Sequence, residues 1–119
     1  KYNCFLSEHR ALPMMYMEDA VRATIELMEA PTEHVKIRSS YNLAGISFDP
    51  ATIGASIKKL MPEFELNFEP DFREDIAASW PESIDDSSAQ ADWNWSQKYN
   101  LDTMTEAMLT NLKTKLQLL

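Results

Sequence analysis

Two histidines and one cysteine are the residues of this 119-residue chain that most readily bind transition metals. His9, His34 and Cys4 stand far apart and form neither an H-E-x-x-H nor a C-x-x-C spacing. Each histidine follows a glutamate outside any hydrophobic period, which indicates a surface position. Cys4 lies in an apolar run, where a buried thiol is unreactive. The sequence therefore predicts no metal site.

Carboxylates are a second group with chemical potential, and six of them gather in the second half of the chain. They are Asp71, Glu74, Asp75, Glu82, Asp85 and Asp86. A calcium loop needs acids at alternate positions and a glycine at its turn, and this segment offers neither. We expect these side chains to be solvated or to cap helices, with Asp85 and Asp86 favoured by the positive end of a helix dipole.

The chain also lacks the residue patterns typical of nucleophilic catalysis and of nucleotide binding. No serine stands in a G-x-S-x-G turn. No tyrosine has a lysine four positions later, the spacing in which a lysine lowers the pKa of a catalytic tyrosine. Gly45 and Gly54 are the only glycines, and they fit neither of the glycine-rich loops that hold phosphates. We expect the chain alone to be inactive and to bind no nucleotide by itself.

Trp80 is the residue hardest to assign to the core. It precedes Pro81 in a stretch without helical or strand period. A tryptophan fixed in this way forms the wall of a pocket or interface, or it packs beneath a loop, and both interpretations stay open on the residues alone. Trp93 and Trp95 end a short helical pattern, which predicts that they belong to the core.

Composition excludes further classes of function. The net charge of −8 disfavours a surface that follows a nucleic-acid backbone. No apolar run reaches the roughly 20 residues of a membrane helix, and no signal-peptide pattern opens the chain. The single cysteine fits a reducing compartment. Because the first residue is Lys1, we expect a processed chain or a piece of a longer one.

Hydrophobic period and turn residues predict an interleaved α/β arrangement. We expect strands at residues 2–6, 13–17, 41–44 and 63–69, the third closed by Gly45. Helices are predicted at residues 18–30, 50–61 and 85–93, the second capped by Asp49 and Pro50. A final helix would begin at an Asp102 cap with Leu101 as a hydrophobic staple. Its apolar stripe would comprise Met104, Met108, Leu112, Leu116 and Leu119. The pattern predicts one α/β domain or a portion of one.

The order of three segments resembles that of the extended short-chain dehydrogenases, which include nucleotide-sugar epimerases and dehydratases. Residues 13–23 resemble their strand-to-helix segment, R-D-[FY]-[IV]-H-V-D-D-[LV]-A-R-A. Residues 40–45 are similar to their Y-N-[IL]-G strand, and residues 84–95 to x-A-D-x-S-K-A-x-x-x-L-G-W. Within this group, the short-chain L-threonine 3-dehydrogenases share L-P-M-M-Y-M, R-S-S-Y-N-L-A-G, E-P-D-F-R and S-W-P-x-S-I-D-D-S. The resemblance covers nearly the whole chain and only the C-terminal part of such an enzyme.

This resemblance implies that residues 1–119 form the smaller, substrate-covering region of a Rossmann-type α/β enzyme. The NAD-binding part and the catalytic Tyr-x-x-x-Lys pair would precede Lys1, and no catalytic or cofactor-binding residue would lie in this chain. The substrate would be L-threonine or a similar small amino acid, with Trp80 as an apolar wall and Leu12 and Met14 on the substrate side. A homodimer is expected, in the cytoplasm of a bacterium or the mitochondrial matrix of a eukaryote.

One departure from the wider group favours the narrower resemblance. Nucleotide-sugar enzymes commonly begin the R-D-[FY] strand with an arginine that pairs with a diphosphate, and here Leu12 and Pro13 occupy these positions. Two alternatives stay open. The chain could be the C-terminal part of a nucleotide-sugar epimerase or dehydratase, or a free-standing, non-catalytic domain that binds a protein partner through its seven methionines and three tryptophans.

Overall fold

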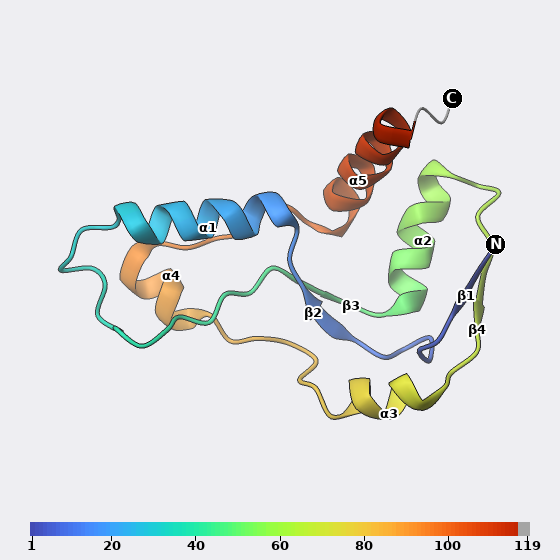
Figure 1. The fold of residues 1–119 in the computed structure, drawn as a ribbon, viewed down its shortest axis with the longest axis horizontal. Helices are drawn as coiled ribbons and strands as arrows, with labels where there is room; N and C mark the ends of the chain where they lie inside the picture. The colour runs from blue at the N-terminus through green and yellow to red at the C-terminus, as the bar shows by residue number, and fades with distance from the viewer. Residues whose placement is uncertain (117–119) are drawn as a thin grey trace.

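The structure, a computed structural model, describes residues 1–116, which form short strands and amphipathic helices in alternation (Figure 1). In chain order they are β1 (Tyr2–Cys4), β2 (Leu12–Met14), α1 (Met17–Glu29), β3 (Ile46–Phe48), α2 (Pro50–Leu60), β4 (Leu66–Phe68), α3 (Phe72–Ala78), α4 (Ser87–Trp93) and α5 (Leu101–Leu116). The predicted α/β class is confirmed. Leu119, predicted to extend the apolar stripe of the last helix, lies outside the described residues.

The strands pair in two separate ladders. β1 runs parallel to β4 at one edge of the molecule, with Cys4 opposite Phe68. β2 runs antiparallel to β3 nearer the centre, with Leu12 opposite Phe48. Both predicted N-terminal strands are shorter than expected because the chain turns between them: the N–H of Arg10 donates to the carbonyl of Ser7 at 3.2 Å.

The strand predicted at residues 41–44 is wrong, and β3 begins only after Gly45. The backbone of this segment bonds to side chains instead of a neighbouring strand. The N–H of Ala44 donates to Asp86 at 3.1 Å, and its carbonyl accepts from the indole of Trp95 at 3.2 Å. Gly45 is required at the close approach to β2, since a Cβ there would lie 2.6 Å from the carbonyl oxygen of Met14. The segment is therefore an irregular connection held by side chains rather than by strand pairing.

Helix ends follow the local cap residues. As predicted, Asp49 caps α2, accepting from the N–H of Thr52 at 2.7 Å. The Asp102 cap is wrong: Asn100 accepts from the N–H of Thr103 at 2.9 Å. Asp102 faces α2 and accepts from Lys59 at 2.8 Å, which joins the two helices. The hydrophobic staple at Leu101 is wrong as well, because this residue already belongs to α5.

The core lies between α1 and α4 and is built around two indoles. Trp95 is 2% exposed and Trp93 is buried beside it, with ring centroids 5.8 Å apart, so their predicted core placement is confirmed. Ala23 of α1 and Ala89 of α4 complete the buried cluster. Between the indoles, Asn94 ends α4 in the left-handed conformation, with φ 63°.

A buried carboxylate fastens the end of this core to the approach of α5. Asp19 is 2% exposed and accepts from the backbone N–H groups of Lys98 and Tyr99 and from the guanidinium of Arg22. Burial alone would raise the pKa of Asp19, but these hydrogen bonds outweigh it, and the pKa is lowered. Arg22 also lies over Trp95, 4.6 Å from the ring centroid. The charge of Asp19 is therefore stabilised by three donors from two distant segments.

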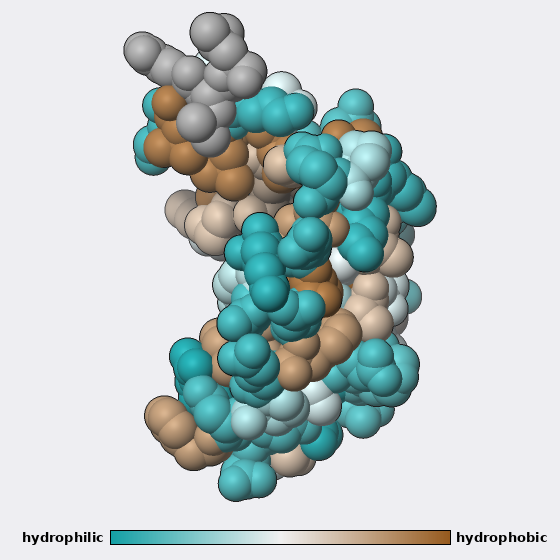
Figure 2. Space-filling view, turned by 90° about the vertical axis from the view of Figure 1, so that its right-hand side faces the viewer, coloured by the Kyte–Doolittle hydropathy of each residue, from teal (hydrophilic) through white to brown (hydrophobic). Residues whose placement is uncertain are grey.

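The molecule is flat, with principal extents of 51 × 36 × 19 Å. Its radius of gyration is 17.0 Å, against about 13.5 Å for a compact domain of this length. One consequence is that the apolar stripe of α1 is exposed, a stripe formed by Met17, Val21, Ile25 and Met28. The face on the side of β1 and β4 is mostly hydrophilic (Figure 2). Among the described residues, no helix has both the length and the apolar character that crossing a membrane requires.

Candidate functional site

The three residues that the sequence singled out for the substrate lie around one apolar cavity of about 310 Å³. Leu12 and Met14 contribute from β2, and Trp80 stands where the chain leaves α3. Phe5 and Leu6, which follow β1, and Ile76 and Ala77 of α3 supply further apolar walls. The structure thus brings together residues up to 68 positions apart, from Leu12 to Trp80. We call this space the α3 cavity.

Trp80 is placed by the end of α3. The N–H of Ser79 donates to the carbonyl of Ile76 at 3.1 Å, and the N–H of Trp80 donates to the carbonyl of Ala77 at 3.1 Å. The Ser79 hydroxyl adds a bond of 2.7 Å to the Ile76 carbonyl. The indole itself is 60% exposed, and Met14 across the cavity is 43% exposed. The cavity is therefore an open apolar surface whose two sides come from β2 and α3.

Helix α3 is the element that the sequence analysis missed, since residues 72–78 were not predicted to be helical. A signal was present: Asp71 follows Pro70, and acids occupy the first turn. Asp71 accepts from the N–H of Arg73 at 2.9 Å, as an N-cap does. Seven residues are too few for the hydrophobic period to show. The carboxylates predicted to cap helices do so at Asp71, and at Asp85, which accepts from the N–H of Ser87.

Arg73 is the one charged residue that lines the α3 cavity. Its guanidinium lies 3.5 Å from the ring centroid of Phe5 and 2.6 Å from a carboxylate oxygen of Asp71. The hydrogen bonds that the Arg73 side chain donates to the Asp71 carboxylate raise the pKa of Arg73, and the same bonds lower the pKa of Asp71. The cation is thus already partnered, and its flat face covers an aromatic wall.

Glu74 ties α3 to the turn between β1 and β2. Its carboxylate accepts from the N–H of Ser7 at 2.9 Å, from the Ser7 hydroxyl at 2.8 Å, and from Arg10 Nε at 2.8 Å, and it forms an ion pair with Arg10 Nη2 at 2.8 Å. The hydrogen bond from the Ser7 N–H, with those from the Ser7 hydroxyl and Arg10, lowers the pKa of Glu74. This arrangement, which we call the Glu74 clamp, bridges residues 64 to 67 positions apart. Sequence reasoning treated Glu74 as a solvated acid, because nothing local shows these distant donors.

The α3 cavity can bind and shield a small apolar group, but its eight lining residues include no proton-transfer group. Seven are apolar or aromatic, and Arg73 stays protonated at any ordinary pH. Within residues 1–116, no group of three or more His, Cys, Asp or Glu side chains is placed to hold a metal ion. His9 and His34 are exposed, and Cys4 is buried in β1, as predicted.

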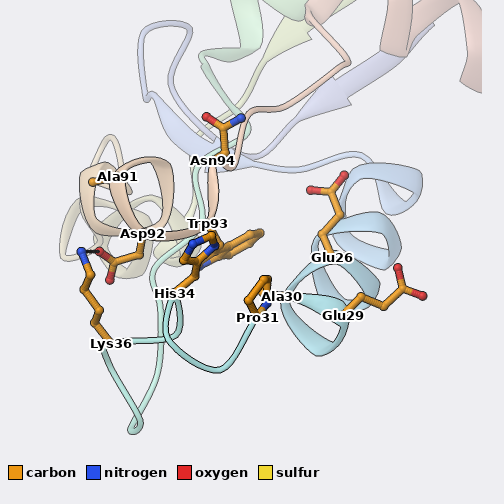
Figure 3. Close-up of a pocket in the computed structure, with 10 residues that line it drawn as sticks. All are labelled: Glu26, Glu29, Ala30, Pro31, His34, Lys36, Ala91, Asp92, Trp93 and Asn94. Carbon is orange, nitrogen blue, oxygen red and sulfur yellow. Dashed lines mark ion pairs between the residues drawn. The ribbon is translucent and has the colours of Figure 1, made fainter.

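A larger cavity, of about 690 Å³, lies at the other end of the molecule between α1, α4 and the loop after α1 (Figure 3). Glu26 and Glu29 stand on one side and the ion pair of Lys36 with Asp92 on the other, at 3.3 Å. Asp92 also accepts from Tyr41, and Glu26 accepts from Arg22 on its own helix. The charges of Glu26, Lys36 and Asp92 are therefore paired internally, and none of the predicted site residues lines this cavity.

Curated relatives are similar to this chain over nearly its whole length. A Staphylococcus epidermidis protein named as an uncharacterized epimerase/dehydratase is 42% identical over 115 residues, covering 96% of this chain and 36% of its own length. A Staphylococcus aureus protein with the same description is 40% identical over 115 residues. No protein-family model matches the chain. The chain is thus similar to about a third of the length of proteins named as epimerase/dehydratases.

Solved structures give a more specific comparison than the curated relatives. The GalE-like L-threonine dehydrogenase of Cupriavidus necator superposes with a TM-score of 0.90 and 58% identity, over 94% of this chain and 40% of that one. The L-threonine dehydrogenase of Phytophthora infestans superposes with a TM-score of 0.91 and 49% identity, over 96% of this chain and 37% of that one. The present chain spans less than half of these relatives. The chain is similar over nearly its whole length to the C-terminal part of GalE-like L-threonine dehydrogenases, which confirms the resemblance found in the sequence.

Proposed function

We propose that this chain forms the substrate side of an NAD-dependent enzyme that oxidises the 3-hydroxyl group of L-threonine, giving 2-amino-3-ketobutyrate. Its role is to cover the amino acid: Leu12, Met14 and Trp80 would contact the substrate, exclude water and hold the reacting carbon in place. The relatives named as L-threonine dehydrogenases support the reaction. The chain's own contribution rests on the α3 cavity.

The observation that carries the proposal is the apolar lining of that cavity. A nucleotide-sugar substrate brings a diphosphate, which needs several cations or free N–H groups. The lining offers a single cation, Arg73, already paired with Asp71, and Leu12 stands where the wider family commonly has arginine. A small substrate without phosphates, such as threonine, fits this surface better.

NAD does not fit the residues of this chain. A dinucleotide loop uses glycines at a tight turn to bring backbone N–H groups to the pyrophosphate. Gly45 and Gly54 both have ordinary φ values, and each packs against another element, at Met14 and at Leu66. In the proposed enzyme, NAD and the groups that move the proton and hydride therefore belong to the part outside this chain. By the same proposal, the enzyme is a homodimer of the bacterial cytoplasm or the mitochondrial matrix.

The test uses the full-length enzyme that contains this chain. NADH absorbance should rise with L-threonine and NAD, and UDP-sugars should give no product. Turnover of a nucleotide sugar without threonine oxidation would assign the chain to an epimerase or dehydratase instead. A native polypeptide that begins at Lys1, folds cooperatively and oxidises nothing would support the free-standing interaction domain.

A further inference from the structure

Helix α3 carries one side of the α3 cavity and buries only part of its apolar surface. Ala77 is 7% exposed, but Phe72 is 71% exposed and Ile76 is half exposed. Apolar burial therefore fixes the position of α3 only in part, and polar interactions must contribute to it.

Polar contacts supply that interaction, and all of them reach the same short segment after β1. The Glu74 clamp joins Ser7 and Arg10. In addition, the N–H of Asp71 donates to the carbonyl of Phe5 at 3.3 Å, and Arg73 lies over the Phe5 ring. The carboxylate of Glu74 is only 17% exposed, accepts three hydrogen bonds, one of them from the Arg10 guanidinium, and forms an ion pair with the same guanidinium. Charge-assisted bonds of this kind are about twice as strong as neutral ones.

The clamp also joins the two sides of the cavity. The turn it holds leads directly into β2 with Leu12, while α3 leads directly to Trp80. No other hydrogen bond recorded among the described residues connects residues 72–80 of α3 and its end to the segment before β2. Within α3, Glu74 is thus the side chain whose hydrogen bonds reach this turn, next to the contact of Arg73 with Phe5 and the backbone bond of Asp71.

We propose that Glu74 is a positioning residue for the substrate cavity: by holding α3 against the turn at Ser7 and Arg10, it sets where Trp80 stands relative to Leu12. The kinetic part of this inference rests on the proposed function, whereas the positioning of α3 does not. Glu74 touches no substrate and acts through Trp80.

The test compares two Glu→Gln variants of the full-length enzyme. Glu74→Gln removes the charge of the clamp, and Glu26→Gln is the matched control, since Glu26 also pairs with an arginine, at 2.7 Å, but lies on α1 away from the α3 cavity. Hydrogen exchange of the backbone amides of residues 75–80 should quicken about tenfold in Glu74→Gln and stay unchanged in Glu26→Gln. The KM for L-threonine should rise about fivefold with kcat within about twofold, as expected for a displaced binding wall.

Variants of the residues that donate to Glu74 test the same contact from its other side. Arg10→Gln should reproduce the effect, and the double variant with Glu74→Gln should add little, because both residues belong to one contact. If Glu74→Gln fails to fold, Ser7→Ala removes one hydroxyl bond and should give a smaller change in the same direction.

Unchanged exchange at residues 75–80 in Glu74→Gln overturns the proposal, because the clamp would not hold α3. Faster exchange with unchanged KM and kcat, in an enzyme that oxidises threonine, also overturns it, since α3 would then be held for stability alone. A wild-type enzyme that does not oxidise threonine refutes the proposed function instead, and the exchange measurement still decides whether Glu74 positions α3.

Discussion

The two ends of the molecule are held together by different physical means. At the α1–α4 end, two indoles and a carboxylate are removed from water, and the segments that meet there are fixed by apolar packing and buried hydrogen bonds. At the α3 end, Leu12 and Ala77 are buried, but Met14, Ile76 and Trp80 are exposed, and polar contacts near the surface help to hold the helix. Elements with few buried apolar contacts open locally at a lower free-energy cost than a packed core does. The difference between the two ends therefore predicts that substitutions at the core end affect stability more than substitutions at the α3 end.

The largest expected effect is at Asp19. Asp19→Ala leaves Arg22 and two backbone N–H groups without their acceptor in a buried place, which should cost about 3 kcal/mol and lower the Tm of the full-length enzyme by about 6 °C or more. Glu29→Ala, on the exposed surface of the same helix, is the control and should leave the Tm unchanged. Equal Tm values for the two variants would refute the distinction between the two ends.

The second-largest expected loss of stability is that of Trp95→Phe. It removes the indole bond to the Ala44 carbonyl, 3.2 Å long, and part of a ring that is 2% exposed. We expect a loss of about 2 kcal/mol, seen as a lower Tm by thermal denaturation. Trp80→Phe, the same exchange at the exposed end, should leave the Tm within about 1 °C. A comparable drop in both would show that the α3 end is as firmly packed as the core.

Trp80→Ala should change function more than stability. Losing one wall of an apolar cavity should raise the KM for L-threonine about tenfold, while the Tm changes little because the indole is mostly exposed. Phe72→Ala is the matched control, since Phe72 is exposed on the same helix and does not line the cavity. An unaltered kcat/KM in Trp80→Ala would remove Trp80 from the substrate surface.

Low pH should reduce the contribution of Asp19 to the free energy of unfolding. Its pKa is lowered in the folded state from 3.8, so its contribution to stability is complete above about pH 3.8 and is lost as the pH falls through the folded-state value. The Tm difference between wild type and Asp19→Asn should therefore be constant near neutral pH and shrink below pH 3.8. A difference that does not change with pH would mean that the charge of Asp19 contributes nothing.

The smallest effect is expected for Lys59→Ala. Lys59 and Asp102 join α2 to α5 at 2.8 Å, but both side chains are mostly exposed to solvent. Solvent-exposed pairs contribute little, so the Tm should change by about 1 °C or less, and added salt should erase the difference. A drop as large as that of Trp95→Phe would show that surface polar contacts can fix an element as firmly as the core does.

Structural features that depend on residues close together in the sequence are predicted correctly from it. The cap at Asp49, the long helices and the core indoles follow from spacing and local chemistry. It fails where distant groups decide: residues 41–44 read as a strand because the side chains that satisfy their backbone lie more than 40 positions away. Glu74 reads as a solvated acid for the same reason. Of the predicted substrate residues, Trp80 was singled out from its own position before Pro81, whereas Leu12 and Met14 came from the family resemblance, and only the structure shows that all three line one cavity.

Asn94, at the end of α4, occupies a position where the family pattern has glycine. The resembling segment of the short-chain dehydrogenases ends in L-G-W, and here the middle position is asparagine with φ 63°. Glycine and asparagine share the ability to occupy this left-handed conformation. In this chain the left-handed angle of Asn94 ends α4, and the two indoles on either side of it lie in the same core. A pattern written for glycine alone would reject a chain that meets the same requirement with a different side chain.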